Sequence, residues 1–176
     1  MGTNHMGRQS IRFPQPPVVR GFASVAGKKE REGPLGDQFT ATVQDTTFGE
    51  KSWERAERRM QQMTLELALE KAGLTDADLD AAFAGDLLNQ CIGSSFSLRN
   101  RGVPTLGLYG ACSTMAESLL LAAMSVSGGY ARTALAMTSS HFASSERQYR
   151  FPLGYGGQRT PTSQWTVTGA GAVLLG

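Results

Sequence analysis

One segment restricts the fold of this chain more than any other, the stretch from Thr114 to Ser127. Its length suits a helix of roughly four turns, and apolar residues occur on every face of that helix: Met115, Ala116, Leu119, Leu120, Leu121, Ala122, Ala123, Met124 and Val126. A helix that is apolar all round is normally buried on all sides. A domain of 176 residues rarely encloses such a helix completely, so we expect it to pack partly against protein that the chain does not contain.

The composition excludes several classes of protein. Hydrophobic residues make up 40% of the chain, too many for a disordered segment, and no run approaches the ~20 apolar residues of a membrane helix. The sequence does not open with the basic and apolar stretches of a secretory signal. The two cysteines, Cys91 and Cys112, are too few for a disulfide framework, which suits a reducing compartment. A net charge of +2 gives no reason to expect a nucleic-acid partner.

Charge is unevenly distributed along the chain. Residues 99–176 contain six arginines and no lysine, against the two acidic residues Glu117 and Glu146. The guanidinium group of arginine matches planar carboxylates and phosphates better than the ammonium group of lysine does. Two interpretations follow from the sequence alone, a surface that binds anions and a basic face exposed to solvent.

Apolar runs alternate with segments of helical periodicity, which predicts an α/β layer architecture. Within 51–72, apolar residues recur at helical spacing, and Gly73 follows where a left-handed cap belongs. We expect that stripe (Trp53, Ala56, Met60, Met63 and Leu67) to be core. A weaker helical pattern covers 89–100, and the glycine-containing segments 27–38 and 140–164 read as a surface loop and an irregular stretch. Strands are expected at 17–25, 81–84, 103–109, 131–139 and 165–175.

Polar residues follow the short apolar run at 81–84. Asp86 stands just beyond the expected carboxyl end of that strand, and Asn89 and Gln90 follow it. Open α/β sheets bind their ligands beyond the carboxyl ends of their strands. Asp86 and Asn89 are therefore candidate ligand-binding residues.

Cys112 lies in the turn between the strand at 103–109 and the apolar helix. Thr114 and Glu117 have the spacing of a capping box, which predicts Thr114 as the N-cap and places Cys112 two residues ahead of the helix. Free amides and the helix dipole favour a thiolate at such a position. The residues alone allow an activated nucleophile and an inert free cysteine.

Several of these motifs together resemble the thiolase and β-ketoacyl synthase superfamily. The segments are 68–80, Gly110-Ala-Cys112, the apolar helix with Ser127-Gly-Gly129, the strand ending in Ser139-Ser-His141, and 168–175. Two further segments, 83–90 and 139–155, are similar to the stage V sporulation protein AD family. The resemblance implies that residues 7–176 form the first half of a thiolase-like fold, a βαβαβαββ unit with a mixed sheet and a buried central helix. Residues 1–6 look like vector sequence.

The resemblance also implies a function. The stage V sporulation protein AD family binds dipicolinic acid and takes part in loading it into the developing spore. The implied partners are dipicolinate, other stage V sporulation A proteins and a second copy of the chain, at the periphery of the spore inner membrane. No cofactor or protein metal site is implied, although calcium could accompany dipicolinate, which chelates it. The candidate ligand-binding residues are Asp86, Asn89, Cys112, Ser113, Ser139, His141, Arg147 and Arg150.

Two alternative functions remain beside ligand binding. One is a cysteine-dependent acyltransferase or condensing enzyme with Cys112 as its nucleophile. In the superfamily's condensing enzymes the cysteine works with histidine and asparagine, or a second histidine, from the second half of the fold, and we expect none of these in this chain. The other is a dimeric scaffold that docks membrane partners. The similarity to a non-condensing family favours binding.

Overall fold

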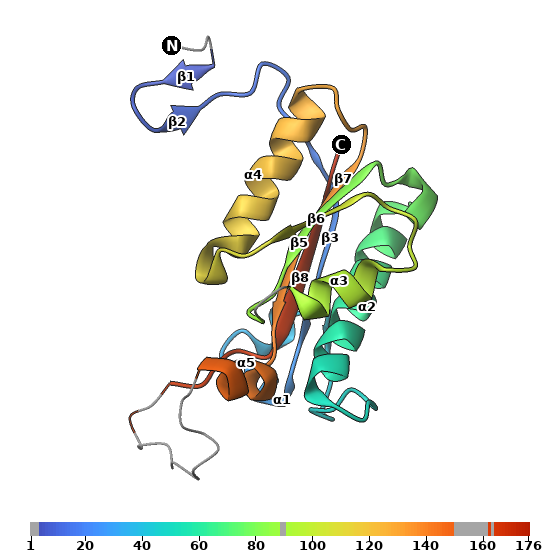
Figure 1. Ribbon diagram of the computed structural model, residues 1–176, viewed down its shortest axis with the longest axis vertical. Helices are drawn as coiled ribbons and strands as arrows, with labels where there is room; N and C mark the ends of the chain where they lie inside the picture. The colour runs from blue at the N-terminus through green and yellow to red at the C-terminus, as the bar shows by residue number, and fades with distance from the viewer. Residues whose placement is uncertain (1–3, 89–90, 150–161, 163) are drawn as a thin grey trace.

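The computed structural model describes residues 4–88, 91–149, 162 and 164–176. Figure 1 shows a central sheet with helices on both of its faces. Helices α2 (Trp53–Ala72) and α3 (Ile92–Leu98) cover one face, and α4 (Thr114–Ser127) covers the other. Within the described ranges, no helix combines the length and the apolar character needed to cross a bilayer.

The sheet contains six strands in the order β4-β3-β8-β7-β5-β6. β8 pairs antiparallel with both of its neighbours, whereas β7, β5 and β6 run parallel to one another. The predicted α/β class with a mixed sheet is therefore confirmed. The strands are β3 (Val19–Ala26), β4 (Ala41–Thr42), β5 (Ala81–Gly85), β6 (Thr105–Leu108), β7 (Ala134–Ser140) and β8 (Gly169–Leu175); β1 (His5–Met6) and β2 (Ser10–Ile11) form a separate hairpin.

Helix α2 begins and ends as its sequence predicts. Ser52 is the N-cap, and its hydroxyl accepts a hydrogen bond from the Arg55 amide at 3.3 Å. Gly73 closes the helix in the left-handed conformation, with φ of 65°, which glycine adopts without steric cost. Ala56 and Met60 are fully buried, as expected for a core stripe. The same helix also buries three polar residues that apolar periodicity does not reveal: Glu57, Gln61 and Thr64.

Helix α4 is only half covered within the described chain. Ala122 and Ala123 are buried against the sheet, in a cluster that includes Phe83 and Ala136. On the opposite face, Leu120 is 44% exposed and Met124 is 45% exposed. Among the described residues, burial on all sides is thus not achieved, and coverage of this second apolar face by other protein stays a prediction.

Two segments expected to be irregular contain short helices. The predicted loop at 27–38 forms α1 (Lys28–Arg31) and the 3-10 turn η1 (Gly36–Gln38), and the stretch at 140–164 begins with α5 (Phe142–Tyr149). Helix α1 buries none of its residues, so it has no apolar period to detect. In α5, the residues buried in the middle are the serines Ser144 and Ser145 rather than apolar side chains. Two further 3-10 turns are η2 (Asp76–Asp78) and η3 (Ala111–Ser113).

Candidate functional site

The three parallel strands bring the predicted site to one edge of the sheet. β5 ends at Gly85, β6 ends at Leu108 and β7 ends at Ser140, all at the same edge because the strands share a direction. Asp86, the turn containing Cys112, and His141 directly follow those ends. Helices α1 and α5 lie at the same end of the molecule (Figure 1).

Cys112 lies inside η3, which runs directly into α4. The residue before it, Ala111, has φ of 49°, an uncommon conformation for a residue other than glycine. The thiol-bearing residue is exposed. A tight left-handed turn therefore presents Cys112 at the start of the helix.

The predicted N-cap at Thr114 is wrong. Thr114 has φ of −55° and ψ of −38°, which are helical values, whereas an N-cap is extended. Its hydroxyl donates to the Ala111 carbonyl at 2.9 Å and accepts from the Gly110 amide at 3.1 Å. Because η3 already supplies the preceding turn, Thr114 is inside the helical path rather than ahead of it.

A cavity of about 590 Å³ opens beside Cys112. Its walls come from β3, β7, β8 and the turn before α4, and most of them are apolar or glycine. Among its described lining residues, Glu30 is the charged one. The lining residues are Val25, Ala26, Glu30, Phe39, Leu87, Ala111, Cys112, Met115, Thr138, Ser139, Ser140, Thr166, Val167, Gly169, Ala170 and Gly171.

The hydroxyl groups in this cavity differ in availability. Ser139 donates its hydroxyl hydrogen to Glu57 at 2.8 Å, and Ser140 donates to the Val167 carbonyl at 2.6 Å. Within the described chain, the Cys112 thiol and the Thr138 hydroxyl make no hydrogen bond. The Thr166 hydroxyl likewise makes no hydrogen bond among the described residues, so this thiol and the two threonine hydroxyls are the side-chain donors free to meet a ligand.

Asp86 stands where the sequence predicts but does not line this cavity. Its residue is 1% exposed, and its carboxylate accepts hydrogen bonds from the Leu88 amide at 2.9 Å, the Ser94 amide at 2.8 Å and the Ser94 hydroxyl at 2.7 Å. These hydrogen bonds connect the start of α3 with the end of β5. Asp86 therefore links these two elements, and its contact with a ligand stays a prediction.

His141 also lies away from the Cys112 cavity. It is fully buried, with its ring 5.4 Å from Trp53 and 5.1 Å from Phe142 between ring centroids. Nε2 lies 2.8 Å from the Thr46 carbonyl, and Nδ1 accepts the Ala143 amide at 3.2 Å. Burial lowers the pKa of His141, which keeps the imidazole neutral. Because these contacts hold the His141 ring away from the Cys112 cavity, His141 is not a partner for the Cys112 thiol.

Four predicted site residues remain, Ser113, Arg147, Asn89 and Arg150. Ser113 is exposed, its hydroxyl donates to the Gly110 carbonyl at 2.7 Å, and it does not line the cavity. Arg147 falls in α5, just beyond the end of β7. Asn89 and Arg150 lie outside the described residues. Of the predicted set, the structure therefore brings Cys112 and Ser139 together.

The buried residue that sequence reasoning missed is Glu57. Its two carboxylate oxygens accept hydrogen bonds from Ser139 at 2.8 Å and from Ser144 at 2.7 Å, which joins α2 to β7 and α5. Desolvation raises the pKa of Glu57 to about 7, and the negative charge of Asp86 adds to the effect.

Gln61 extends this network one turn further along α2. Its amide nitrogen donates to the Ser139 hydroxyl at 2.7 Å, and its oxygen accepts from the Ser97 hydroxyl at 2.6 Å. Glu57, Gln61 and Thr64 follow one another at helical spacing beside the buried Met60. That polar stripe next to an apolar one is the signal that could have revealed the network.

Among the described residues, no three His, Cys, Asp or Glu side chains gather as a metal site would require.

Comparison with known proteins agrees with the fold. Residues 7–176 match the family model described as stage V sporulation protein AD. The protein of that name from Bacillus subtilis (strain 168) is 44% identical over 169 residues, which are 96% of this chain and 50% of the relative. The chain thus spans about half the length of the relative it matches.

Two solved structures show the same architecture at low sequence identity. OleA from Xanthomonas campestris aligns with a TM-score of 0.60 and 14% identity, over 92% of this chain and 56% of that one. The 3-oxoacyl-(acyl carrier protein) synthase III from Aquifex aeolicus aligns with a TM-score of 0.58 and 18% identity, over 90% of this chain and 53% of that one. At these identities the likeness shows the fold alone. By its sequence match and its thiolase-like fold, this chain belongs to the stage V sporulation protein AD family.

Proposed function

We propose that this chain binds dipicolinic acid and supports its uptake into the developing spore. Membership of the sporulation protein AD family supports the biological setting. The observation that carries the proposed site is the cavity of about 590 Å³ beside Cys112, at the carboxyl edge of the parallel strands. A cavity of that volume lies in the usual range for small-molecule sites.

The lining of this cavity suits the pyridine ring of dipicolinate better than its two carboxylates. Apolar walls such as Leu87 and Met115 can pack against a flat pyridine ring, and the Cys112 thiol and Thr138 hydroxyl can donate hydrogen bonds. Two carboxylates also need positive charge. Because the charged residue among the described lining is the acidic Glu30, we assign that charge to Arg147 and Arg150 or to a calcium ion carried by the ligand.

Substitution of the two arginines tests this assignment. Removing a charged hydrogen bond to a carboxylate typically costs about 1.5–3 kcal/mol, so Arg150→Ala and Arg147→Ala should each weaken dipicolinate binding by roughly 10-fold or more. Arg132→Ala is the matched control, because Arg132 precedes β7, roughly 23 Å along the strand from Ser139. Isothermal titration calorimetry measures all three. Normal binding by both test variants would remove these arginines from the site.

Acyl transfer at Cys112 is the second candidate function. An exposed thiol at the start of a helix, beside a cavity, favours it. In that reaction the Cys112 sulfur would attack the carbonyl of an acyl thioester, and the carrier thiol would leave with the proton. Among the described residues, no histidine lies beside the thiol, since His141 is held against Trp53 and Phe142.

One set of measurements separates the two functions. Dipicolinate, with and without calcium, is titrated calorimetrically into the chain, its Cys112→Ala variant and the Bacillus subtilis relative, and each protein is then incubated with an acyl thioester and weighed by mass spectrometry. Saturable binding that survives Cys112→Ala supports a binding protein. Acylation of Cys112 without dipicolinate binding supports an acyltransferase. Binding by the relative alone would place part of the site in the portion that this chain does not span.

The proposal includes partners that follow from the same family. We assign the chain a homodimeric state and a position at the periphery of the spore inner membrane, with other stage V sporulation A proteins as neighbours. Sedimentation equilibrium tests the first point. Co-purification with those proteins from sporulating cells, compared with an untagged control, tests the second.

A further inference from the structure

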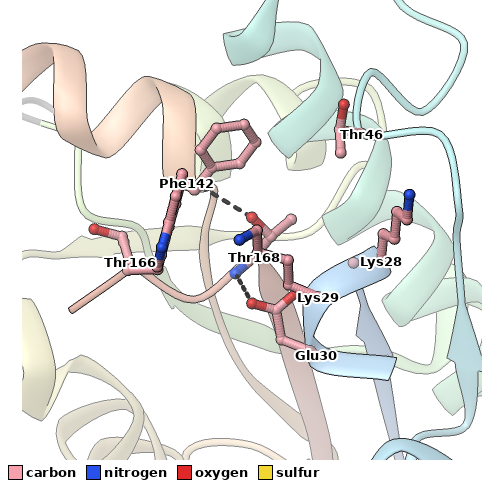
Figure 2. A pocket seen from close by; sticks show the side chains of 9 residues that line it. Lys28, Lys29, Glu30, Thr46, Phe142, Thr166 and Thr168 are labelled. Atoms are coloured by element: carbon pink, nitrogen blue, oxygen red, sulfur yellow. Dashed lines mark hydrogen bonds between the residues drawn. The ribbon is translucent and has the colours of Figure 1, made fainter. Parts of the chain in front are cut away.

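A second, smaller cavity of about 180 Å³ lies between α1, α5 and the segment that leads into β8. Figure 2 shows Phe142 and Thr166 on one side of it and Lys28 on the other, with Thr168 between them, next to Lys29 and hydrogen-bonded to Glu30. Trp165 and Thr46 complete the described walls together with Gly27. Cys112 does not line this cavity, although both cavities share Glu30 and Thr166.

Hydrogen bonds from Thr168 fix three walls of this cavity. Its amide donates to Glu30 Oε1 at 3.0 Å, its carbonyl accepts the Gly27 amide at 2.8 Å, and its hydroxyl accepts the Phe142 amide at 3.0 Å (Figure 2 draws the first and last). Thr168 is itself buried. The cavity is therefore preformed, as binding sites for small molecules usually are.

The apolar part of the lining is aromatic. The rings of Phe142 and Trp165 lie 6.0 Å apart between centroids in an edge-to-face arrangement. The volume of about 180 Å³ is close to that of the roughly 150 Å³ apolar cavity that admits a benzene molecule. Size and lining together suit one aromatic ring.

The charged part of the lining is positive. Lys29 Nζ lies 3.9 Å from the centroid of the Trp165 ring, and Lys28, which precedes it on α1, extends its side chain away from the aromatic rings (Figure 2). In the described part of the chain, neither ammonium group makes an ion pair or a hydrogen bond. Glu30 contributes the opposing charge and is engaged by the Thr168 amide. Two ammonium groups against one carboxylate leave a single net positive charge.

We propose that this cavity binds a small monoanion with one aromatic ring, an aromatic monocarboxylate being the simplest case. The ring packs against Phe142 and Trp165, the carboxylate meets the ammonium group of Lys29, and Lys28 adds positive charge from the opposite side of the cavity. Thr166 and Thr46 also line the cavity. This site goes beyond the proposed function and does not rest on it, because none of its ring-binding or cationic residues lines the Cys112 cavity.

The two tryptophans of the chain allow a direct test. In the ¹⁵N-labelled protein they give two indole signals, which Trp165→Phe assigns. Benzoate is the probe, and benzamide and benzylamine are controls with the same ring and neutral or positive charge. We expect benzoate to shift the Trp165 signal saturably, with benzamide at least 10-fold weaker and benzylamine without effect.

Variants then identify the site. Lys28→Met and Lys29→Met should each weaken benzoate at least threefold, and the double variant should abolish saturation. Lys51→Met, at an exposed lysine outside this cavity, and Cys112→Ala should leave the benzoate affinity unchanged. The proposal is overturned if millimolar benzoate gives no saturable shift, if benzamide binds as well, or if the double lysine variant binds normally while Cys112→Ala does not. That last pattern would assign the ligand to the Cys112 cavity.

Discussion

At the scale of single residues, Ser139 connects the Cys112 cavity with the buried network behind it. Its side chain lines the cavity, while its hydroxyl donates to Glu57 and accepts from Gln61. When Glu57 is ionised, the Ser139 hydroxyl donates its hydrogen to the carboxylate. When Glu57 is protonated, that hydroxyl can point its hydrogen elsewhere. A buried carboxyl with a pKa of about 7 places this choice near neutral pH.

The pH dependence of stability should reveal this carboxyl. Its pKa is raised from 4.5 to about 7 by folding, so its contribution to the free energy of unfolding is full below pH 4.5 and is lost as the pH rises through 7. The difference corresponds to on the order of 3 kcal/mol. Glu57→Gln removes the titration and keeps the shape. Urea unfolding of both proteins from pH 4.5 to 8.5 should show wild type losing stability relative to the variant. A constant difference would contradict the raised pKa.

Gly85 has no side chain, which lets the end of β5 pack closely against the end of β6 and the start of α4. A Cβ atom there would overlap the Leu108 carbonyl and the methyl group of Thr114. Gly85→Ala should therefore lower the free energy of unfolding by about 1–3 kcal/mol, the usual cost of overpacking. Gly171→Ala is the matched control, because its Cβ would meet no atom within 4 Å. Thermal unfolding compares the two, and equal melting temperatures would disprove the close approach.

At the scale of elements, α4 has one face in the core and one face that the described part of the chain leaves open. Replacing Leu120 and Met124 together by glutamine should change the free energy of unfolding by less than about 1 kcal/mol, since both are well exposed. Ala123→Gln, on the covered face, should cost considerably more. Chemical denaturation measures these effects, and binding of a hydrophobic dye should fall in the double variant. A large loss of stability from the double variant would show that the exposed face is already engaged.

Elements with a regular apolar pattern could be predicted from sequence, and the others could not. The spacing of apolar residues from Trp53 to Leu67 predicts helix α2, and Gly73 predicts where it ends. Helices α1 and α5 escaped detection because charged residues make up the first and serines are buried in the second. The turn at Cys112 ahead of a helix was predictable, whereas the role of Cys112 in a site stays a prediction. Asp86 and His141 were placed correctly along the chain, but side-chain direction depends on packing that no spacing reveals.

At the scale of the whole molecule, β8 holds the sheet together. It lies between β3 and β7 and pairs with both along its length. Without it, β3 keeps only its short pairing with β4. A chain that ends at Thr168 should therefore show no cooperative unfolding transition by circular dichroism. A chain that begins at Phe13 is the control, since it loses only the separate β1–β2 hairpin, and it should unfold cooperatively. A sharp transition in the first chain would refute this role.

The position of β8 also sets the order of events on the ribosome. In an N-to-C synthesis, the strand that ties residues 19–26 to β7 is made only after a further 140 residues or so of chain. Until then β3 has an unpaired edge, and Phe22 on it is 60% exposed even in the finished fold. The nascent chain therefore carries an unpaired strand edge until β8 has been made, which makes this fold a natural client for chaperones that shield such edges.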